Sequence, residues 1–167
     1  MRVKFRIAQP TDLPSIVEIY NQAVALKRAT AELTPVSAES KREWLAGHTP
    51  GNYPVFVAEK GNVVVGWCSL SPYRRGRMAL RYTAEISYYI HQDFRRMGIG
   101  SQLVALAMEQ SRTRGIKTLI AILLDVNLGS IRLLEKLGFR KWGELPGVAD
   151  FDGNECGHLY YGFRVQS

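Results

Sequence analysis

The sequence predicts a mixed α/β fold that forms a single domain over residues 1–167. A chain of 167 residues with 46% hydrophobic content is large enough to close one core without disulfides or metals. Segments of alternating or β-branched residues are interleaved with segments whose apolar residues recur every three to four positions, the patterns of strands and helices. Residues 116–124 are almost continuously apolar and follow a helical pattern, which indicates a strand buried on both faces of a sheet.

The N-terminal half is expected to contain a strand, two helices and a β-hairpin. Pro10 and Asp12 can begin the first helix, because Leu13, Ile16 and Tyr20 follow at the spacing of one buried face. The expected elements are a strand at 3–7, helices from residue 10 and over 38–46, and hairpin strands at 55–59 and 63–70 joined by a turn at 60–62.

The C-terminal half is expected to alternate strands with helices. β-Branched and aromatic residues favour a strand before the glycine-containing segment at its centre, and Gly115 and Gly138 are placed to end two helices. The expected elements are a strand at 82–90, a helix at 101–114, a strand at 116–124, a helix at 127–137, and two final strands at 139–145 and 158–165.

Composition argues against several classes of function. Residues 3–7 alternate and do not resemble a signal peptide, and no stretch approaches the roughly 18 uninterrupted apolar residues of a membrane span. We therefore expect a cytoplasmic protein with no membrane partner. Cys68 and Cys156 form neither a CxxC pair nor a His-rich cluster, so no metal site is expected and buried thiols are the simpler interpretation.

The net charge of +7 favours an anionic partner, because positive fields attract phosphates. Nucleic acid is one such partner, but the Lys and Arg residues form no long run and no RNP-like or zinc-finger pattern organises base readout. A polyphosphorylated small cofactor explains the charge equally well, and so does a solvated basic surface. We expect no nucleic-acid partner.

Residues 88–101 join the end of a strand, a basic glycine loop and the beginning of a helix. The unpaired N–H groups of a helix N-terminus form an anion site. Gly98 and Gly100 remove side chains where a pyrophosphate must approach backbone amides, and Arg95 and Arg96 add positive charge at the same place. A lone Gly-x-Gly is weak, but the strand before it and the helix after it are the context that such a loop requires.

Two motifs resemble the GNAT superfamily of acetyl-CoA-dependent N-acetyltransferases. Arg95-Arg96-Met97-Gly98-Ile99-Gly100 fits the Arg/Gln-x-x-Gly-x-Gly/Ala cofactor motif of that family at every fixed position. Asn127, followed by Leu133-Leu134-Glu135-Lys136-Leu137-Gly138-Phe139, resembles a second family element, Asn with a downstream Leu-x-x-Lys-x-Gly-Phe. Residues 53–59 and 83–90 look like the phosphinothricin and L-amino acid N-acetyltransferase branch, and the resemblance covers residues 3–145.

The resemblance implies a GNAT fold, with a mixed and mostly antiparallel sheet, flanking helices, and fourth and fifth strands that splay apart to admit the pantetheine of acetyl-CoA, the cosubstrate. The implied cofactor-binding residues are the backbone groups of Tyr88, Tyr89 and Ile90, the pyrophosphate loop Arg95, Arg96, Met97, Gly98, Ile99, Gly100 and Ser101, and Asn127, Ser130 and Lys136 from the following helix. For Asn127, a plain helix N-cap is the alternative.

Glu85 is the predicted general base. An ammonium group must lose a proton before its nitrogen can attack a thioester, and a carboxylate can take that proton directly or through one water. Strand alternation places Glu85, Ser87 and Tyr89 on one face, next to the stretch expected to bind pantetheine. The alternative is that Glu85 only pairs with an arginine of the connection 73–81, and the two roles are compatible.

Arg74 and Arg77 are predicted to bind a carboxylate of the substrate. A guanidinium can hold a carboxylate through two parallel hydrogen bonds, and both residues match basic positions of the substrate loop in the related branch if one residue is inserted here. The alternative is that these are solvated surface arginines.

The predicted function is transfer of the acetyl group of acetyl-CoA to the primary amine of a small amino-acid-like substrate, of the phosphinothricin or methionine sulfoximine type. Two alternatives stay open: a GNAT enzyme acting on a protein N-terminus or lysine, and a non-catalytic acyl-CoA-binding module. A homodimer is expected from the family resemblance, and because the apolar segment 160–163 exceeds what one core can cover.

Leu134 departs from the family pattern. Many members of the superfamily have a tyrosine there, and the nearest branch often a histidine, to protonate the leaving thiolate, whereas leucine has no proton to donate. Tyr160 or a bound water can take that role, or the thiolate can leave unprotonated, since a thiol pKa near about 8.5 makes it a tolerable leaving group. We expect the unprotonated route.

Overall fold

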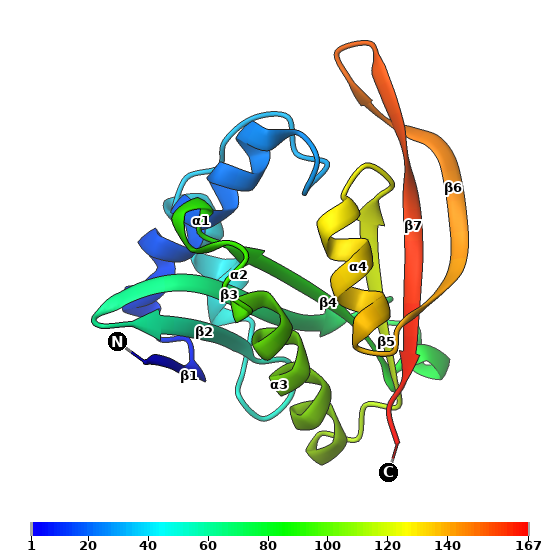
Figure 1. Cartoon of the computed structure of the whole chain (residues 1–167). Helices are drawn as coiled ribbons and strands as arrows, with labels where there is room; N and C mark the ends of the chain where they lie inside the picture. Colours follow the sequence, from blue (N-terminus) through cyan, green and yellow to red (C-terminus); the bar gives the residue numbers. More distant parts are fainter. Residues whose placement is uncertain (1, 167) are drawn as a thin grey trace.

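The computed structural model describes residues 2–166, which fold around one seven-stranded sheet (Figure 1). The strands lie in the order β1-β2-β3-β4-β5-β7-β6. Their bounds are β1 Val3–Ile7, β2 Val55–Lys60, β3 Val63–Pro72, β4 Thr83–Ile90, β5 Thr118–Leu124, β6 Arg140–Phe151 and β7 Asn154–Arg164. The α-helices are α1 Leu13–Leu26, α2 Arg42–Ala46, α3 Ile99–Thr113 and α4 Leu128–Lys136.

The sheet divides between β4 and β5. These two strands form the parallel pair, and their pairing is confined to Thr83–Glu85 against Thr118–Ile120. Beyond Glu85 the strands diverge, which Figure 1 shows as a V-shaped gap. All other neighbouring strands pair antiparallel. The predicted mixed, mostly antiparallel α/β sheet with a splay between its fourth and fifth strands is therefore confirmed.

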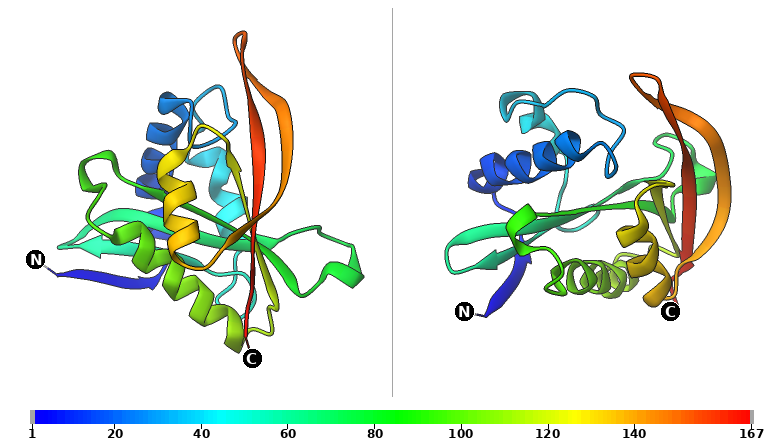
Figure 2. Two further views of the ribbon diagram at one scale, coloured as in Figure 1. Left: turned by 45° about the vertical axis from the view of Figure 1, so that its right-hand side comes forward. Right: turned by 45° about the horizontal axis from the view of Figure 1, so that its top comes forward.

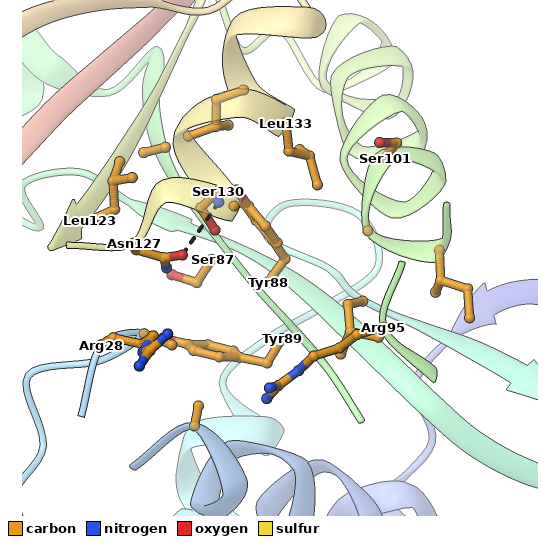
Figure 3. Close-up of a pocket in the computed structure, with 18 of the residues that line it drawn as sticks. Arg28, Ser87, Tyr88, Tyr89, Arg95, Ser101, Leu123, Asn127, Ser130 and Leu133 are labelled. Carbon is orange, nitrogen blue, oxygen red and sulfur yellow. Dashed lines mark hydrogen bonds between the residues drawn. The ribbon is translucent and has the colours of Figure 1, made fainter. Parts of the chain in front are cut away.

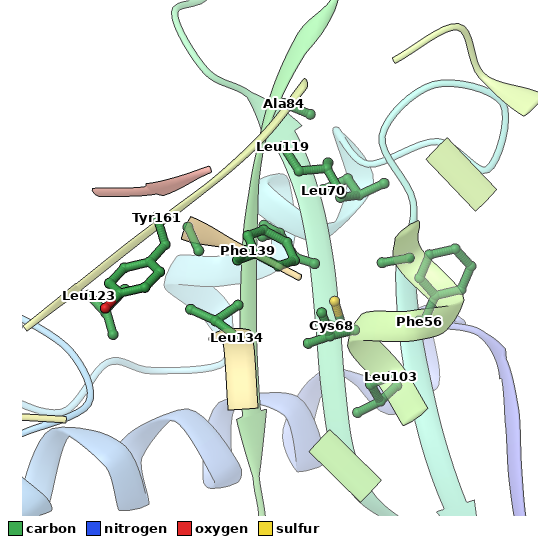
Figure 4. Close-up of a cluster of buried hydrophobic side chains, with 14 of the residues drawn as sticks. Phe56, Cys68, Leu70, Ala84, Leu103, Leu119, Leu123, Leu134, Phe139 and Tyr161 are labelled. Atoms are coloured by element: carbon green, nitrogen blue, oxygen red, sulfur yellow. The ribbon is translucent and has the colours of Figure 1, made fainter. Parts of the chain in front are cut away.

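The helices cover both faces of the sheet (Figure 2). On one face α3 and α4 pack over the larger core, which includes Leu103, Leu134 and Phe139 (Figure 4). On the other face α1 and α2 cover a smaller cluster built around Ile16 and Trp67. Because strand side chains alternate between faces, each of the central strands β3 and β4 contributes to both clusters.

Most predicted elements are found within a few residues of their expected bounds, but the last two strands are much longer than predicted. They form one hairpin that includes residues 146–151 and 154–157, whose far end projects beyond the rest of the sheet (Figure 1). Asp152 and Gly153 both have positive φ, 55° and 97°, as a two-residue hairpin turn requires. The Gly153 N–H donates to the Asp150 carboxylate at 2.6 Å.

The segment 160–163 does not leave an apolar surface, so that reason for expecting a dimer is wrong. Tyr161 and Gly162 are buried, and the Trp142 indole lies where a side chain at position 162 would otherwise stand. Several of the exposed apolar side chains gather instead on β6, where Trp142, Leu145 and Val148 are 49%, 44% and 56% exposed.

Among residues 2–166, no helix combines the length and the apolar character needed to cross a lipid bilayer. The same described residues contain no group of three or more His, Cys, Asp and Glu side chains that could hold a metal ion.

Candidate active site

A cleft of about 510 Å³ runs through the gap between β4 and β5 (Figure 3). Its walls are the diverging strands, the N-terminal ends of α3 and α4, and the end of α1 with the residues that follow it. A gap in a sheet exposes unpaired backbone N–H and C=O groups, which can pair with an extended ligand as a further strand would. The polar residues that line it include Ser87, Tyr88, Tyr89, Arg95, Arg96, Ser101, Asn127 and Ser130.

The N-terminus of α3 is open to an anion. Gly98 is its N-cap with a φ of 78°, no side chain caps the helix, and the first turn contains no acidic residue. Its first N–H groups have no partner within the helix, and the helix dipole adds partial positive charge there. Arg96 holds the left-handed φ of 61°, which is uncommon outside glycine. This tight basic loop can therefore bind a phosphate group through backbone amides and guanidinium groups.

The N-terminus of α4 faces the same cleft. Asn127 is the N-cap of this helix, and its side-chain oxygen accepts a hydrogen bond from the Ser130 N–H at 3.3 Å. The capping alternative for Asn127 is thus correct, and because Asn127 also lines the cleft its remaining polar groups are available to a ligand.

The Tyr88 hydroxyl is the buried side-chain polar atom without a hydrogen-bond partner in the described part of the chain. Burial raises the pKa of Tyr88 well above its usual range, and the nearby Ser130 side chain opposes that rise. A buried donor without a partner is costly, so its position on the cleft fits a ligand that brings a polar group to it. The cleft is therefore suited to a long, phosphate-bearing molecule.

The structure brings most of the predicted cofactor residues to this cleft. Those that line it are Tyr88, Tyr89, Ile90, Arg95, Arg96, Gly98, Ile99, Gly100, Ser101, Asn127 and Ser130. Met97 and Lys136 are exposed and do not line it. Arg28, which the sequence did not suggest, lines the cleft beyond the end of α1, and Figure 3 shows Tyr89 between Arg28 and Arg95.

A second cavity of about 260 Å³ lies under α1 and α2, on the opposite face of the sheet from α3. Its floor is a ladder of three cross-strand pairs between β3 and β4: Trp67 with Tyr89, Ser69 with Ser87, and Ser71 with Glu85. Directly opposed residues of an antiparallel pair point to the same face. The prediction that Glu85, Ser87 and Tyr89 share a face is confirmed.

Aromatic side chains form much of the wall of this second cavity. Trp67 packs against Tyr89 with ring centroids 5.0 Å apart and against Trp44 at 5.4 Å, and Tyr20 meets Tyr89 edge to face at 5.1 Å. The indole N–H of Trp67 donates to the Ile16 carbonyl at 3.1 Å, so this wall is fixed. The cavity therefore suits a compact ligand with both apolar and polar parts.

Glu85 is the acidic residue on this floor. Burial raises its pKa above the usual value, and no arginine of the connection 73–81 forms an ion pair with it among residues 2–166. The alternative in which Glu85 only neutralises an arginine therefore finds no partner in the described chain. A carboxylate with a raised pKa is a stronger base than an ordinary glutamate, which suits it to accept a proton.

The cleft and the second cavity meet at β4, because Ser87 and Tyr89 line both. The gap in the sheet can hold an extended anionic molecule and the space beside Glu85 a small one, an arrangement suited to an enzyme that transfers a group between them.

Other predicted residues lie elsewhere. Arg74 and Arg77 are exposed on the connection that follows β3, and neither lines the cleft or the second cavity in the chain described here. Leu134 is fully buried and lines the cleft, whereas Tyr160 lies on β7 and lines neither space.

Comparison with known proteins assigns this arrangement to a family. The model of the Acetyltransferase (GNAT) family matches residues 15–139. YwnH of Bacillus subtilis, provisionally named a phosphinothricin acetyltransferase, is 40% identical over 89% of this chain and 90% of its own length. The L-methionine sulfoximine/L-methionine sulfone acetyltransferase of Pseudomonas paraeruginosa is 34% identical over 89% of this chain and 86% of its own length. The crystal structure of a phosphinothricin acetyltransferase from Sinorhizobium meliloti with acetyl-CoA superposes with a TM-score of 0.92 and 29% identity, over 99% of this chain and 89% of that chain.

The chain belongs to the GNAT family of acetyltransferases. It is an acetyl-CoA-dependent N-acetyltransferase, and acetyl-CoA is its cosubstrate. The non-catalytic acyl-CoA-binding alternative is therefore set aside.

Proposed function

We propose that this protein, acting as a single domain over residues 1–167, acetylates the primary amine of small amino-acid-like substrates. The observation that carries the proposal is the junction of a phosphate-binding cleft with a cavity of about 260 Å³ that contains Glu85. A cavity of that size admits a small molecule more readily than a folded protein surface. Phosphinothricin and methionine sulfoximine, the substrates in the names of the relatives, are the first compounds to test.

In this proposal the residues that line the cleft hold acetyl-CoA. Backbone groups of Tyr88 to Ile90 pair with its pantetheine, and the loop from Arg95 to Ser101 holds its pyrophosphate, as the open N-terminus of α3 supports. Met97 and Lys136 do not line the cleft, so in this proposal they contact acetyl-CoA at most through their backbone or at its edge. When bound, acetyl-CoA supplies an acetyl group activated as a thioester.

Glu85 is the proposed general base, and it accepts the proton that the acceptor ammonium must lose. Its position on the floor of the second cavity, two residues from Ser87 where the two spaces meet, supports that role. We further propose that the protein acts in the cytoplasm, where acetyl-CoA is available.

The direct test is turnover. The protein is incubated with acetyl-CoA and a panel of amines, and the release of free CoA thiol is followed. The panel contains phosphinothricin, methionine sulfoximine, common L-amino acids, and peptides with a free N-terminus or lysine. We expect the small amino-acid-like amines to react fastest, and preferential acetylation of the peptides would favour the protein-directed alternative.

Arg74→Ala and Arg77→Ala are expected to raise KM by about tenfold for substrates with a free α-carboxylate, because each removes one charge-assisted bidentate contact. Both side chains are exposed and lie outside the cavities of this chain, so the proposal requires the connection to close over the bound substrate. Methyl esters of the same substrates are the control. Equal rates on an amino acid and its ester would contradict this role.

A homodimer is also proposed, now on the basis of β6. This strand is the last of the sheet, and Trp142, Leu145 and Val148 leave it with an exposed apolar surface. Light scattering at micromolar concentration is expected to give twice the mass of 18.8 kDa, and Trp142→Glu to give the monomer. Val63→Glu, at an exposed apolar position far from β6, is the matched control. A wild-type protein that scatters as a monomer would exclude the dimer.

A further inference from the structure

His48 and Ser71 form a hydrogen-bonded pair at the edge of the second cavity. His48 follows α2 and is partly buried. Its Nδ1 lies 2.7 Å from the carbonyl oxygen of Trp44, and its Nε2 lies 3.2 Å from Oγ of Ser71. Both ring nitrogens are therefore engaged, and the second one reaches a residue that lines the cavity.

The chemistry of these partners fixes the direction of both hydrogen bonds. A carbonyl oxygen can only accept, so Nδ1 carries the proton. Burial and the positive charge of Arg75 lower the pKa of His48, although the Trp44 carbonyl opposes this, so the ring is neutral at physiological pH. A neutral imidazole protonated at Nδ1 has an acceptor at Nε2. The Ser71 hydroxyl therefore donates its proton to His48.

With its proton directed at His48, the Ser71 oxygen has lone pairs left to accept a hydrogen bond. Ser71 is the cross-strand partner of Glu85, and both side chains point to the face that forms the floor of the cavity. Two acceptors thus lie side by side, a carboxylate and a hydroxyl oxygen, where an amine with several N–H groups would bind.

We propose that Ser71 accepts a hydrogen bond from the acceptor amine and that His48 is the positioning residue that keeps Ser71 in this state. The inference rests on the proposed function of the same site. Glu85 takes one proton from the ammonium, and Ser71 holds a second N–H. The two contacts together hold the amine nitrogen beside the junction of the two spaces at Ser87 and Tyr89, within reach of a donor in the cleft.

The protonation of His48 reverses this arrangement. A protonated Nε2 donates to Ser71, whose own proton then turns toward the cavity and opposes the N–H groups of the amine. The charged and titratable groups around the pair are Arg75 near His48, and Lys41, Glu85, Tyr20 and Tyr89 around the cavity. Binding of the amine is therefore expected to weaken in acid when His48 becomes charged, separately from the protonation of Glu85.

The test is a KM-against-kcat comparison on three variants. Ser71→Ala removes the acceptor, His48→Phe keeps an aromatic ring but removes Nε2, and His48→Gln restores a side-chain acceptor. KM for the amine is expected to rise about fivefold to tenfold in Ser71→Ala and in His48→Phe, with kcat nearly unchanged, because the hydrogen bond is present both before and in the transition state. His48→Gln is expected to recover most of the affinity. KM for acetyl-CoA is expected to stay unchanged in all three.

Two further readings separate positioning from a purely structural role. In the double variant Ser71→Ala with His48→Phe, the KM for the amine is expected to be no higher than in either single variant, since both substitutions remove the same interaction. In the wild-type protein, protonation of His48 is expected to raise the KM for the amine as the pH falls. This rise is expected to be absent in His48→Gln, because the glutamine amide does not titrate.

The outcomes distinguish the inference from the function on which it rests. If the wild-type protein acetylates no amine of the panel, the proposed function fails and the inference fails with it. If the wild-type protein is active and Ser71→Ala leaves the KM for the amine unchanged, only the inference is overturned. A His48→Phe variant that raises KM for both substrates equally would indicate a structural role for His48 and would also overturn the inference. If His48→Phe does not fold, the KM of Ser71→Ala for the amine decides whether the inference holds.

Discussion

Replacing Gly98 by glutamate is expected to abolish acetyl-CoA binding. Gly98 is the N-cap of α3, and a side chain there would stand at the mouth of the anion site with nothing closer than the Gln102 side chain at 3.8 Å. A carboxylate at a helix N-terminus is attracted by the same N–H groups that would hold a pyrophosphate, so it both occupies the site and repels the ligand. Titration calorimetry with acetyl-CoA is the measurement.

A matched variant is needed because Gly98 has a positive φ of 78°, where most side chains are strained. Gly98→Asn is the control, since asparagine tolerates the left-handed conformation better than other residues and carries no charge. We expect Gly98→Asn to keep measurable affinity for acetyl-CoA. A folded Gly98→Glu protein with wild-type affinity would show that the loop is not the pyrophosphate site.

Glu85→Gln is expected to lower kcat roughly 100-fold to 10,000-fold, the range over which a general base contributes. The amide keeps the shape of the side chain but cannot take a proton, so KM for acetyl-CoA is expected to change little. Burial raises the pKa of Glu85, so the wild-type rate is expected to rise with pH through a value above that of an ordinary glutamate. This rise of the rate with pH is expected to be absent in Glu85→Gln. A variant that retains the wild-type rate and profile would exclude Glu85 as the base.

At higher pH the wild-type kcat is expected to stay level, because Leu134 has no proton to give and Tyr160 does not line the cleft. The Tyr88 hydroxyl does line it, but burial raises the pKa of Tyr88 and keeps this group protonated, so it adds no falling limb. An essential acid would instead add a falling limb. An alkaline limb that disappears in Tyr160→Phe would contradict the unprotonated route.

The raised pKa of Glu85 also affects the stability of the folded protein. A carboxyl group whose pKa is higher in the folded than in the unfolded protein favours folding in acid, and this contribution is lost as pH rises through the folded-state value. Glu85→Gln is therefore expected to raise Tm at neutral pH and to lose this advantage in acid. Thermal unfolding at the two pH values measures the effect, and it would mark Glu85 as a residue kept for activity at the expense of stability.

Local patterns were sufficient to predict the parts of the site that lie on one continuous segment. Glu85, Ser87 and Tyr89 share a face because strand alternation is a local property, and the loop around Gly98 was recognisable from its glycines and arginines between a strand and a helix. Even here the motif did not settle which of its residues line the cleft, and Met97 and Lys136 are exposed and do not line it.

Features that depend on distant contacts could not be predicted in this way. Ser71 and His48 are 23 residues apart, and no local pattern in the sequence indicates that they meet at the cavity. Arg28 reaches the cleft because α1 ends beside β4, which no local pattern contains. The long final hairpin is a different case, because Asp152-Gly153 is a recognised hairpin signal between two strand-like runs and was present in the sequence.

The position of Ser87 and Tyr89 between the cleft and the second cavity also bears on the order of kinetic events. Donor and acceptor each have their own space and meet at one strand, so both can be bound before either product forms. A ping-pong route would need a nucleophile with an adjacent base at that junction to store the acetyl group. Ser87 lies there, but the histidine that reaches the second cavity is hydrogen-bonded to Ser71 and not to Ser87. Cys68, which is fully buried in the larger core and whose thiol pKa is raised by that burial, is held away from it and in its unreactive form. Direct transfer within a ternary complex is the kinetic scheme that this architecture favours.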